Sequence, residues 1–371
     1  MAYITLNRTK LTHNYEFLDR MFRRHRIEWA VVVKLLCGNE LYLREVLQLN
    51  PRQLCDARIS NLKVVKKLSP DTETVYIRPA PLRNIAAVVR YADISFNTQV
   101  RTLKKLSEEA VQQGKIHKVV VVVELGERRE GVMRSQIVDF YEKVRVLPNL
   151  RIVGLGANFA CLSGVLPNRA KLRQLVLYRD LIVRKTGDLL PVVSGGSSVV
   201  IPLLQRKAVP SQVNHFRVGE TLFFGTNAYP GEVIPGMYGD VLMLHAQIIE
   251  LIRKPMLPDG ELGANLEGYT PEFNPEDGAE TAWRAIVDVG LLDVESDHLS
   301  PVDPQMQCIG ASSDMLVVNL GTNPGGYKTG DHIAFKLDYM GVLRLMNSRY
   351  IEKRVIVPDA ECPICANRIS D

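Results

Sequence analysis

Residues Trp29 to Lys34 read Trp-Ala-Val-Val-Val-Lys, an apolar and mostly β-branched run that stops at a lysine. A run of this kind is typical of a strand that is buried on both faces in a parallel sheet. Lys34 then lies where the strand opens onto a functional face, and its charge must be paired, neutralised or used covalently. A simpler alternative is that Lys34 only extends its ammonium group into solvent at the edge of the strand.

Seven more short apolar runs follow, and stretches with helical periodicity separate them. Strands that alternate with helices over about 200 residues predict a closed (β/α)8 TIM barrel, with functional residues at the carboxyl ends of the strands. We expect this barrel to span residues 1–235. The eight predicted strands are Ala30–Val33, Gln53–Asp56, Thr74–Ile77, Ala92–Phe96, Lys118–Glu124, Ile152–Asn158, Pro191–Ser194 and Val213–Val218.

The sequence pattern changes from about Val241, where longer β runs replace the alternation of strands and helices. A loop rich in Gly, Pro and Glu, residues 254–281, interrupts these runs, and the helical stretch Tyr339–Met346 is short. The simplest interpretation is a mostly β domain over residues 236–357, followed by a polar tail over 358–371. The predicted strands of this domain are Val241–Ile252, Ala285–Val289, Met315–Leu320, Ile333–Leu337 and Tyr350–Val357.

The chain has 371 residues, of which 46% are hydrophobic and 23% are charged, values typical of a globular protein with a substantial core. Its net charge of +5 is mild, and the basic cluster Arg23–Arg26 lies in a helical stretch, where a solvated face is favoured over a nucleic-acid patch. No apolar run is long enough to span a membrane, and no signal-peptide pattern opens the chain. We therefore expect a cytoplasmic protein without nucleic-acid or membrane partners.

Two of the six cysteines, Cys362 and Cys365, form a Cys-Pro-Ile-Cys motif in the polar tail. Such a pair can bind a metal or cycle between redox states, but a zinc site usually needs four ligands, and neither a second pair nor a nearby histidine accompanies it. The other four cysteines lie in or beside apolar runs, where reduced cysteine packs as a small hydrophobic residue. We expect no metal site.

Polar motifs follow the predicted strands at the points where they end. They are Glu124–Gly131 after the fifth strand, Asn158–Ala160 after the sixth, Ser194–Ser198 after the seventh, and Arg217–Glu220 on and after the eighth. The Gly-rich turn after the seventh strand offers free backbone N–H groups and, with the glycine after the eighth, predicts the phosphate cup that barrels build at this place. Together with Lys34 and the arginines of two motifs, these parts suit a cofactor that carries both an aldehyde and a phosphate.

These motifs, in this order and at similar spacing, resemble the signature sites of alanine-racemase-like, fold-type III pyridoxal phosphate (PLP) enzymes. Four motifs of the second half resemble the ornithine-racemase branch of predicted amino-acid racemases: Gly260–Gly263, Val289–Asp293, Ser300–Pro304 and Gly310–Asp314. The resemblance covers nearly the whole chain, to about Val355.

The resemblance implies a role for each motif residue. Lys34 would form an aldimine with PLP and then act as a base on one face of the substrate Cα. Arg217 would face the pyridine nitrogen, and because a guanidinium does not readily give up its proton, this suits reversible proton transfer more than decarboxylation or transamination. Arg129 would lie near the cofactor phenolate or the substrate carboxylate, and a surface ion-pair network with Glu127 and Glu130 is the alternative for it.

The resemblance also implies a set of phosphate contacts. The phosphate would be bound by Ser197, Ser198 and the backbone of Gly219 and Glu220, while Asn158 would lie over the ring. Taken alone, the two serines are more often a plain helix cap, which a phosphate site also requires. In alanine racemases a histidine occupies the position of Asn158.

The chain departs from the family at the second base. Alanine racemases supply the opposite face of the Cα with a tyrosine from the β domain of the partner subunit, and the aligned residue here is Leu291, which cannot transfer a proton. Asp293, Ser313 and Asp314, together with Ser312, are the candidates to replace it. For Asp293 and Asp314, capping or turn chemistry is an equally good interpretation.

We therefore expect a PLP-dependent amino-acid racemase that interconverts L- and D-amino acids, acts on a cationic substrate such as ornithine or lysine, and forms a head-to-tail homodimer. Acidic residues of the β domain would suit such a substrate. One alternative is another PLP-dependent reaction on the same fold, by a decarboxylase or lyase. The other is a non-catalytic PLP-binding or regulatory protein, which the loss of the tyrosine favours and the presence of a β domain disfavours.

Overall fold

The structure, a computed structural model, describes residues 1–229, 231–264, 268, 270 and 281–357. It divides into two compact units, Lys10–Gly239 and a second one that joins Met1–Thr9 to the chain from Asp240 onward. The predicted tail with Cys362 and Cys365, and part of the loop 254–281, lie outside the described residues.

The first residues of the chain belong to the β unit, which differs from the predicted barrel domain of residues 1–235. Strand β1 (Tyr3–Asn7) pairs antiparallel with β10 (Leu242–Pro255) and parallel with β16 (Glu352–Ile356), and its Ile4 and Leu6 are fully buried. Both partners come from the second half of the sequence. No local pattern could therefore assign this strand to its unit.

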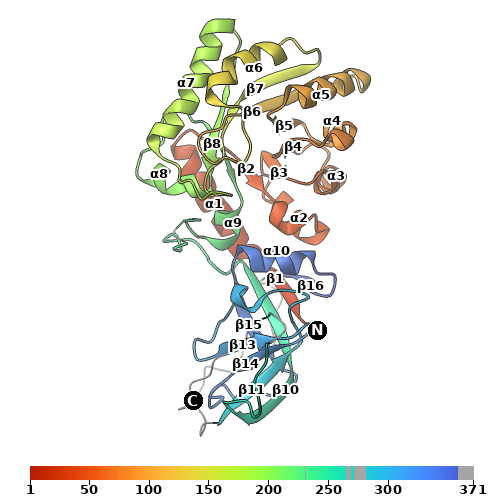
Figure 1. Cartoon of the computed structure of the whole chain (residues 1–371), viewed down its shortest axis with the longest axis vertical. Helices are drawn as coiled ribbons and strands as arrows, with labels where there is room; N and C mark the ends of the chain where they lie inside the picture. The colour runs from red at the N-terminus through yellow and green to blue at the C-terminus, as the bar shows by residue number, and fades with distance from the viewer. Residues whose placement is uncertain (230, 265–267, 269, 271–280, 358–371) are drawn as a thin grey trace. The chain divides into compact units, whose positions relative to one another are not determined.

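Eight parallel strands close into the barrel of the unit Lys10–Gly239 (Figure 1). Each strand pairs with the next, and β9 closes the ring against β2, with Arg217 opposite Ala30. The predicted (β/α)8 barrel is confirmed. Its strands are β2 (Glu28–Val32), β3 (Gln53–Asp56), β4 (Glu73–Tyr76), β5 (Ile94–Asn97), β6 (His117–Val122), β7 (Leu150–Gly156), β8 (Val192–Ser197) and β9 (His215–Val218).

Apolar side chains from different strands pack together in one core cluster, as a barrel interior requires. Val32 of β2 takes part in it, which explains the apolar run before Lys34. β-Branched side chains fit such a pleated, closely packed surface. The buried members of the cluster are Ala30, Val32, Cys55, Val75, Ile94, Phe96, Val120, Val122 and Val153.

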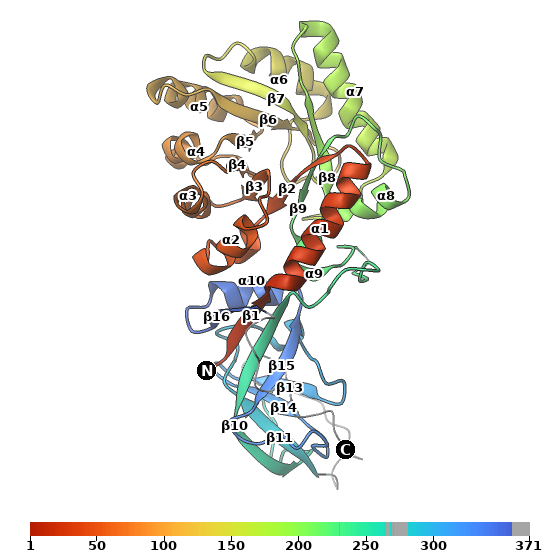
Figure 2. The ribbon, with the colours of Figure 1, turned by 180° about the vertical axis from the view of Figure 1, so that it is seen from behind.

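Helices surround the barrel (Figures 1 and 2). In α5, for example, Leu103, Leu106 and Ala110 recur at helical spacing and are buried, so the apolar face of the helix packs inward. In α1 the ring of Phe22 lies 5.2 Å from Phe216 of β9, measured between centroids. The helices are α1 (Arg8–Arg24), α2 (Glu40–Leu47), α3 (Ile59–Leu68), α4 (Ile85–Tyr91), α5 (Val100–Gln112), α6 (Ile137–Val144), α7 (Arg169–Thr186), α8 (Ile201–Gln205) and α9 (Glu220–Phe224).

The β unit is built around a sheet in the order β12-β15-β10-β11-β14-β13. All five strands predicted for this half are present, and α10 (Tyr339–Asn347) corresponds to the short predicted helix. Two strands were not predicted, β12 (Leu299–Pro301) and β13 (Gln307–Ala311), because one has three residues and the other lies exposed at an edge. The remaining strands are β11 (Thr281–Val287), β14 (Leu316–Asn319) and β15 (His332–Leu337).

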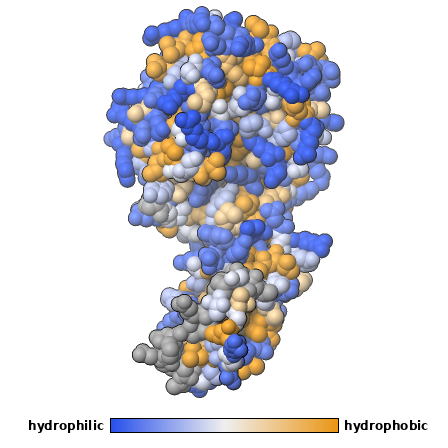
Figure 3. Space-filling view, in the orientation of Figure 1, coloured by the Kyte–Doolittle hydropathy of each residue, from blue (hydrophilic) through white to orange (hydrophobic). Residues whose placement is uncertain are grey.

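The face of the barrel unit seen in Figure 3 carries mostly hydrophilic side chains with scattered apolar ones, the usual surface of a globular protein. Among the helices that the structure describes, none has the length and apolar character needed to cross a membrane.

Candidate active site

The predicted cofactor residues all lie at or just after the carboxyl ends of barrel strands. Lys34 comes two residues after β2, Asn158 two residues after β7, and Arg129 in the loop that follows β6. Ser197 ends β8, while Arg217 is the third residue of β9. Because the strands are parallel, these positions meet at one end of the barrel.

Arg217 is buried, with only 6% of its surface exposed, and it donates to neutral acceptors. Its Nη1 donates to the carbonyl oxygen of Ser194 at 3.0 Å and also to the Ser194 hydroxyl. Its Nη2 donates to the carbonyl oxygen of Ala157 and to Oδ1 of Asn158, both at 2.9 Å. The guanidinium also lies over the ring of Phe96, 4.8 Å from its centroid. Burial lowers the pKa of Arg217 to about 10, so the side chain stays charged at neutral pH.

One donor of Arg217 is left over. Among the described residues, none accepts a hydrogen bond from its Nε–H. A planar guanidinium held through both Nη groups has little freedom to turn, so the direction of this N–H is fixed. The acceptors of this buried guanidinium are neutral rather than acidic.

Glu130 connects Arg129 to the group around Arg217. Both Glu130 oxygens accept from the Arg129 guanidinium, one of them from Nη2 at 2.5 Å. The same carboxylate accepts from Nδ2 of Asn158, whose Oδ1 in turn accepts from Arg217. Arg129 also contacts Sγ of Cys161, and its hydrogen bonds to Glu130 raise its pKa. Of the ion-pair network expected as an alternative role for Arg129, the pair with Glu130 is present, and no pair between Arg129 and Glu127 is found among the described residues.

Glu127 fastens the loop after β6 to the loop after β7. It is 2% exposed and accepts from three backbone N–H groups: those of Cys161 and Ser163 at 2.8 Å, and that of Val165 at 3.1 Å. Burial alone would raise the pKa of Glu127, but these backbone hydrogen bonds hold it below its ordinary value. Glu127 thus stabilises the backbone beside Arg129.

The turn after β8 and the start of α9 lie against each other, as a phosphate cup requires. The Ser198 hydroxyl accepts from the backbone N–H of Thr221 at 3.3 Å. Gly219 passes so close to β2 that an added Cβ would lie 2.6 Å from the carbonyl oxygen of Val32, so no other residue fits there. Burial raises the pKa of the Glu220 carboxyl. The predicted phosphate residues are therefore brought together, while Ser197 forms the end of β8.

Lys34 opens a short 3₁₀ turn, Lys34–Leu36, and its side chain is exposed. Its charge acts on two carboxyl groups of the barrel, those of Asp56 and Glu220, and favours the ionised form of each. Asp56 ends β3 and is fully buried, and burial raises its pKa to about 6. Lys34 is therefore an exposed cation at the end of β2 whose charge reaches the carboxyl groups of Asp56 and Glu220.

The candidates for the second base belong to the β unit, after β11 and β13. Leu291 donates its backbone N–H to the carbonyl oxygen of Ser312 at 2.9 Å, so two turns lie side by side. Ser313 and Asp314 are exposed at the tip of one turn. Oδ1 of Asp293 accepts from the Ser348 hydroxyl at 2.6 Å. The turn chemistry expected for these residues is present, and a catalytic role for them stays a prediction.

Sequence reasoning named Glu127 and Glu130 only as ion-pair partners of Arg129, and it gave no role to the buried Asp56. Glu127 and Glu130 look like solvated charges in a run of charged residues. Asp56 looks like an ordinary turn residue after a strand. The available signal was position, since each follows the carboxyl end of a barrel strand.

The arrangement fits PLP. The Nε–H of Arg217 is a donor without an acceptor among the described residues, and a pyridine nitrogen is an acceptor. Oγ1 of Thr221 is a buried polar atom without a partner in the described part of the chain, beside the turn predicted to bind phosphate oxygens. Lys34, at the end of β2, supplies the amine that an aldehyde needs.

Comparison with known proteins indicates the same family as the motifs do. The profile of the alanine racemase N-terminal domain matches residues 6–227. The chain is 35% identical to ornithine racemase of Acetoanaerobium sticklandii, with 95% of this chain and 99% of that protein covered. It is 27% identical to lysine racemase of Thermotoga maritima, with 94% and 97% covered.

A solved alanine racemase from Streptomyces coelicolor A3(2) matches the structure with a TM-score of 0.72 at 15% identity, covering 96% of this chain and 98% of the other. At that identity the likeness shows the fold alone. The resemblance that the motifs indicated is confirmed, and the chain belongs to the alanine racemase family.

Proposed function

We propose that the protein is a PLP-dependent amino-acid racemase that interconverts the L- and D-forms of a cationic amino acid. Membership of the family makes it an isomerase, and the curated relatives include an ornithine and a lysine racemase. The observation that carries the proposal is Arg217, buried among neutral acceptors with its Nε–H unused by the described residues, in a barrel whose first strand leads to Lys34.

Each site residue has a binding task in this proposal. Lys34 holds the cofactor through its Nζ, and the Nε–H of Arg217 donates to the pyridine nitrogen. The phosphate is bound by Ser197, Ser198 and the backbone of Gly219 and Glu220. PLP, when bound, supplies an electron-withdrawing ring that makes the Cα proton of an attached amino acid acidic.

Two residues hold the polar edge of the site. Asn158 lies over the ring and keeps its orientation, since Arg217 and Glu130 bond to its two ends. Arg129 binds the substrate carboxylate or the cofactor phenolate. Because Nε and Nη2 of Arg129 both donate to Glu130, the guanidinium is fixed before substrate arrives, and this lowers the entropic cost of binding.

Lys34 would act as the base on one face of the Cα, because its Nζ can take up or give back a proton at that position. Arg217 donates a hydrogen bond and keeps its own proton, since its pKa of about 10 lies above neutral pH. Arg217 would therefore leave the pyridine nitrogen unprotonated, an arrangement that suits reversible proton transfer more than decarboxylation.

The opposite face of the Cα needs a second proton carrier, which Leu291 cannot be. We assign this role to the turn residues of the β unit, with Asp314 first and Asp293 and Ser313 as the other candidates. In the head-to-tail homodimer that the family implies, this unit would come from the partner copy.

The proposal is tested by reconstituting purified protein with PLP and recording its visible absorption, followed by D/L conversion of ornithine, lysine, arginine, serine and alanine. We expect an imine band that borohydride removes, and racemisation of at least ornithine or lysine. Lys34→Ala should lose both, whereas the exposed control Lys63→Ala on α3 should keep both. A band without any turnover would favour a non-catalytic PLP-binding protein, and release of carbon dioxide or a side chain would favour a decarboxylase or lyase.

A further inference from the structure

A chain of hydrogen bonds runs from Arg217 down the inside of the barrel. The Ser194 hydroxyl, which accepts from Arg217, lies 2.8 Å from Nδ1 of His215. Nε2 of His215 lies 2.9 Å from Oε1 of Gln53, and Nε2 of Gln53 donates to Oε2 of Glu73 at 2.7 Å. His215, Gln53 and Glu73 are the first residues of β9, β3 and β4. The series of hydrogen bonds therefore runs from the cofactor end of the strands to the other end.

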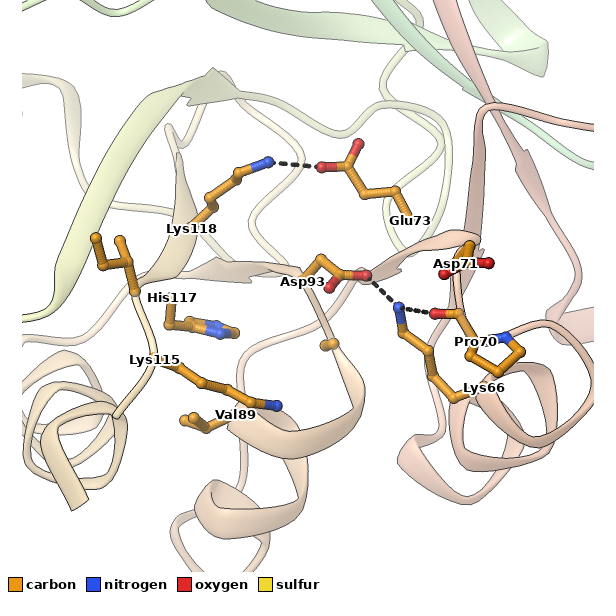
Figure 4. Close-up of a pocket in the computed structure, with 11 residues that line it drawn as sticks. Lys66, Pro70, Asp71, Glu73, Val89, Asp93, Lys115, His117 and Lys118 are labelled. Atoms are coloured by element: carbon orange, nitrogen blue, oxygen red, sulfur yellow. Dashed lines mark hydrogen bonds and ion pairs between the residues drawn. The ribbon is translucent and has the colours of Figure 1, made fainter. Parts of the chain in front are cut away.

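The series of hydrogen bonds ends at an ion pair that is exposed to solvent. Lys118, near the start of β6, donates to the second Glu73 oxygen at 2.7 Å, and the two side chains are 42% and 25% exposed (Figure 4). They line a cavity of about 470 Å³ at this end of the barrel. By contrast, Ser194 and His215 are buried, with 0% and 6% of their surface exposed. A buried polar chain thus links a solvated ion pair to the site.

The chemistry of the two ends allows one direction for every bond in between. Glu73 only accepts, so the amide nitrogen of Gln53 must face it, and the amide oxygen must face His215. Nε2 of His215 is then the donor, which leaves Nδ1 as an acceptor in the neutral ring. The Ser194 hydroxyl proton therefore goes to Nδ1, and the lone pairs of its oxygen are left for Arg217.

Burial keeps His215 in this neutral form. It lowers the pKa of the ring to about 3, and the charges of Arg217 and Arg52 act in the same direction. The imidazole is therefore uncharged near neutral pH, and its single proton is held at Nε2 by the Gln53 oxygen.

We propose that His215 is a positioning residue for the reaction, which acts by fixing the Ser194 hydroxyl so that it accepts from Arg217 and holds the guanidinium in the direction that aims its Nε–H into the site. The inference rests on the proposed function for what Arg217 contacts. The tautomer of His215, however, is a property of the protein alone, and it can be measured without cofactor or substrate.

The barrel supplies a matched control in His117. This histidine is also the first residue of a strand, is 2% exposed, and bonds through Nε2 to the hydroxyl of Ser95 at 2.7 Å. The ring is also hydrogen-bonded to the backbone of Ala92, and because this bond raises the pKa of the ring, the ring is its donor. Since Nε2 faces Ser95, Nδ1 is the nitrogen that donates, and Nε2 then accepts the Ser95 proton while the Ser95 oxygen accepts from Nδ2 of Asn97. The two buried histidines should therefore carry opposite tautomers, with the proton on Nε2 in His215 and on Nδ1 in His117.

The first test is nitrogen NMR of the full chain labelled with ¹⁵N-histidine, with the signals assigned by their loss in His215→Phe and His117→Phe. We expect a protonated Nε2 and an unprotonated Nδ1 in His215, and the reverse in His117. A protonated Nδ1 in His215, or a ring protonated at both nitrogens at neutral pH, would overturn the proposal.

The second test compares the same two variants in turnover. Both remove one buried His–Ser bond, so their melting temperatures should fall together. A poorly aimed catalytic contact can cost about 10²-fold, so His215→Phe should lower kcat by roughly 10- to 100-fold with little change in KM and should shift the cofactor absorption band, whereas His117→Phe should leave both unchanged. Equal kcat in the two variants would overturn the proposal. Failure of the proposed function looks different, because wild-type protein would then not racemise any amino acid.

Discussion

Replacing Glu127 by glutamine should release the loop after β7 without touching the cofactor residues themselves. Oε1 of Glu127 accepts from Cys161 and Ser163, and Oε2 accepts from Val165. A glutamine keeps one oxygen for the first two N–H groups, but its NH2 group meets the third N–H as donor against donor. The variant therefore loses one charge-assisted bond and turns the other two into neutral bonds.

The size of the effect follows from these three bonds. A hydrogen bond to a buried charged group contributes about 1.5–3 kcal/mol and a neutral one about 0.5–1.5 kcal/mol. Even at the lower ends of these ranges, losing one charged bond and weakening two others should cost at least about 3 kcal/mol of local stability. Since 1.36 kcal/mol corresponds to a factor of ten, the loop should open at least about 10²-fold more often.

Native-state hydrogen exchange at the amides of Cys161, Ser163 and Val165 measures this opening directly. We expect the protection of these amides to fall by at least about 10²-fold in Glu127→Gln. The control is Glu142→Gln, which removes a solvent-exposed pair with Lys185 (3.0 Å) and should leave the three amides unchanged. A fall in protection of less than about threefold in Glu127→Gln would refute the conclusion that Glu127 holds this loop in place.

Three further outcomes are expected. Asp188 accepts from Arg145 and from the Tyr141 hydroxyl, and its pKa is lowered from 3.8 to about 2, mainly by Arg145. The stability that the ionised carboxylate contributes is complete above pH 3.8 and is lost as the pH falls through about 2. The melting temperature of Asp188→Asn should therefore lie below that of the wild type at pH 6 and equal it near pH 2. Gly219→Ala, whose Cβ would lie 2.6 Å from the Val32 carbonyl oxygen, should weaken PLP binding about tenfold or more in a fluorescence titration, whereas Gly310→Ala, with open space around it, should not. Asp314→Asn should lower kcat by about 10²-fold or more if Asp314 is the second base, with the absorption band of bound cofactor kept, and unchanged turnover would move the role to Asp293 or Ser313.

The barrel was predictable because its signal is local. Each strand is a short apolar run, and polar motifs follow several of them, while the roles of the motif residues stay predictions. Lys34 and Arg217 were therefore placed at the right end of the right strands from the sequence. The parallel pairing of Ala30 with Arg217 confirms that the first and last strands meet.

What could not be predicted depends on contacts between distant parts of the chain. Strand β1 joins the β unit through partners in the second half of the sequence, and β12 has only three residues. Nothing in the local sequence around Glu130 and His215 indicates their roles, because each role depends on the residues that the side chain contacts elsewhere in the protein. Similarly, the neutral acceptors of Arg217 come from two different strands or the loops after them.

Exchange of the Cα proton together with conversion between the enantiomers separates racemisation from the decarboxylase and lyase alternatives. Protein with PLP is incubated with L-ornithine in D₂O, and the amino acid is then separated into its enantiomers and examined by mass spectrometry. We expect deuterium at Cα in both enantiomers, a D/L ratio that approaches one, and no loss of carboxylate or side chain, all of it absent in Lys34→Ala. If L-ornithine and L-lysine both keep their Cα protons, or if an amine and carbon dioxide form instead, the protein is not the racemase proposed.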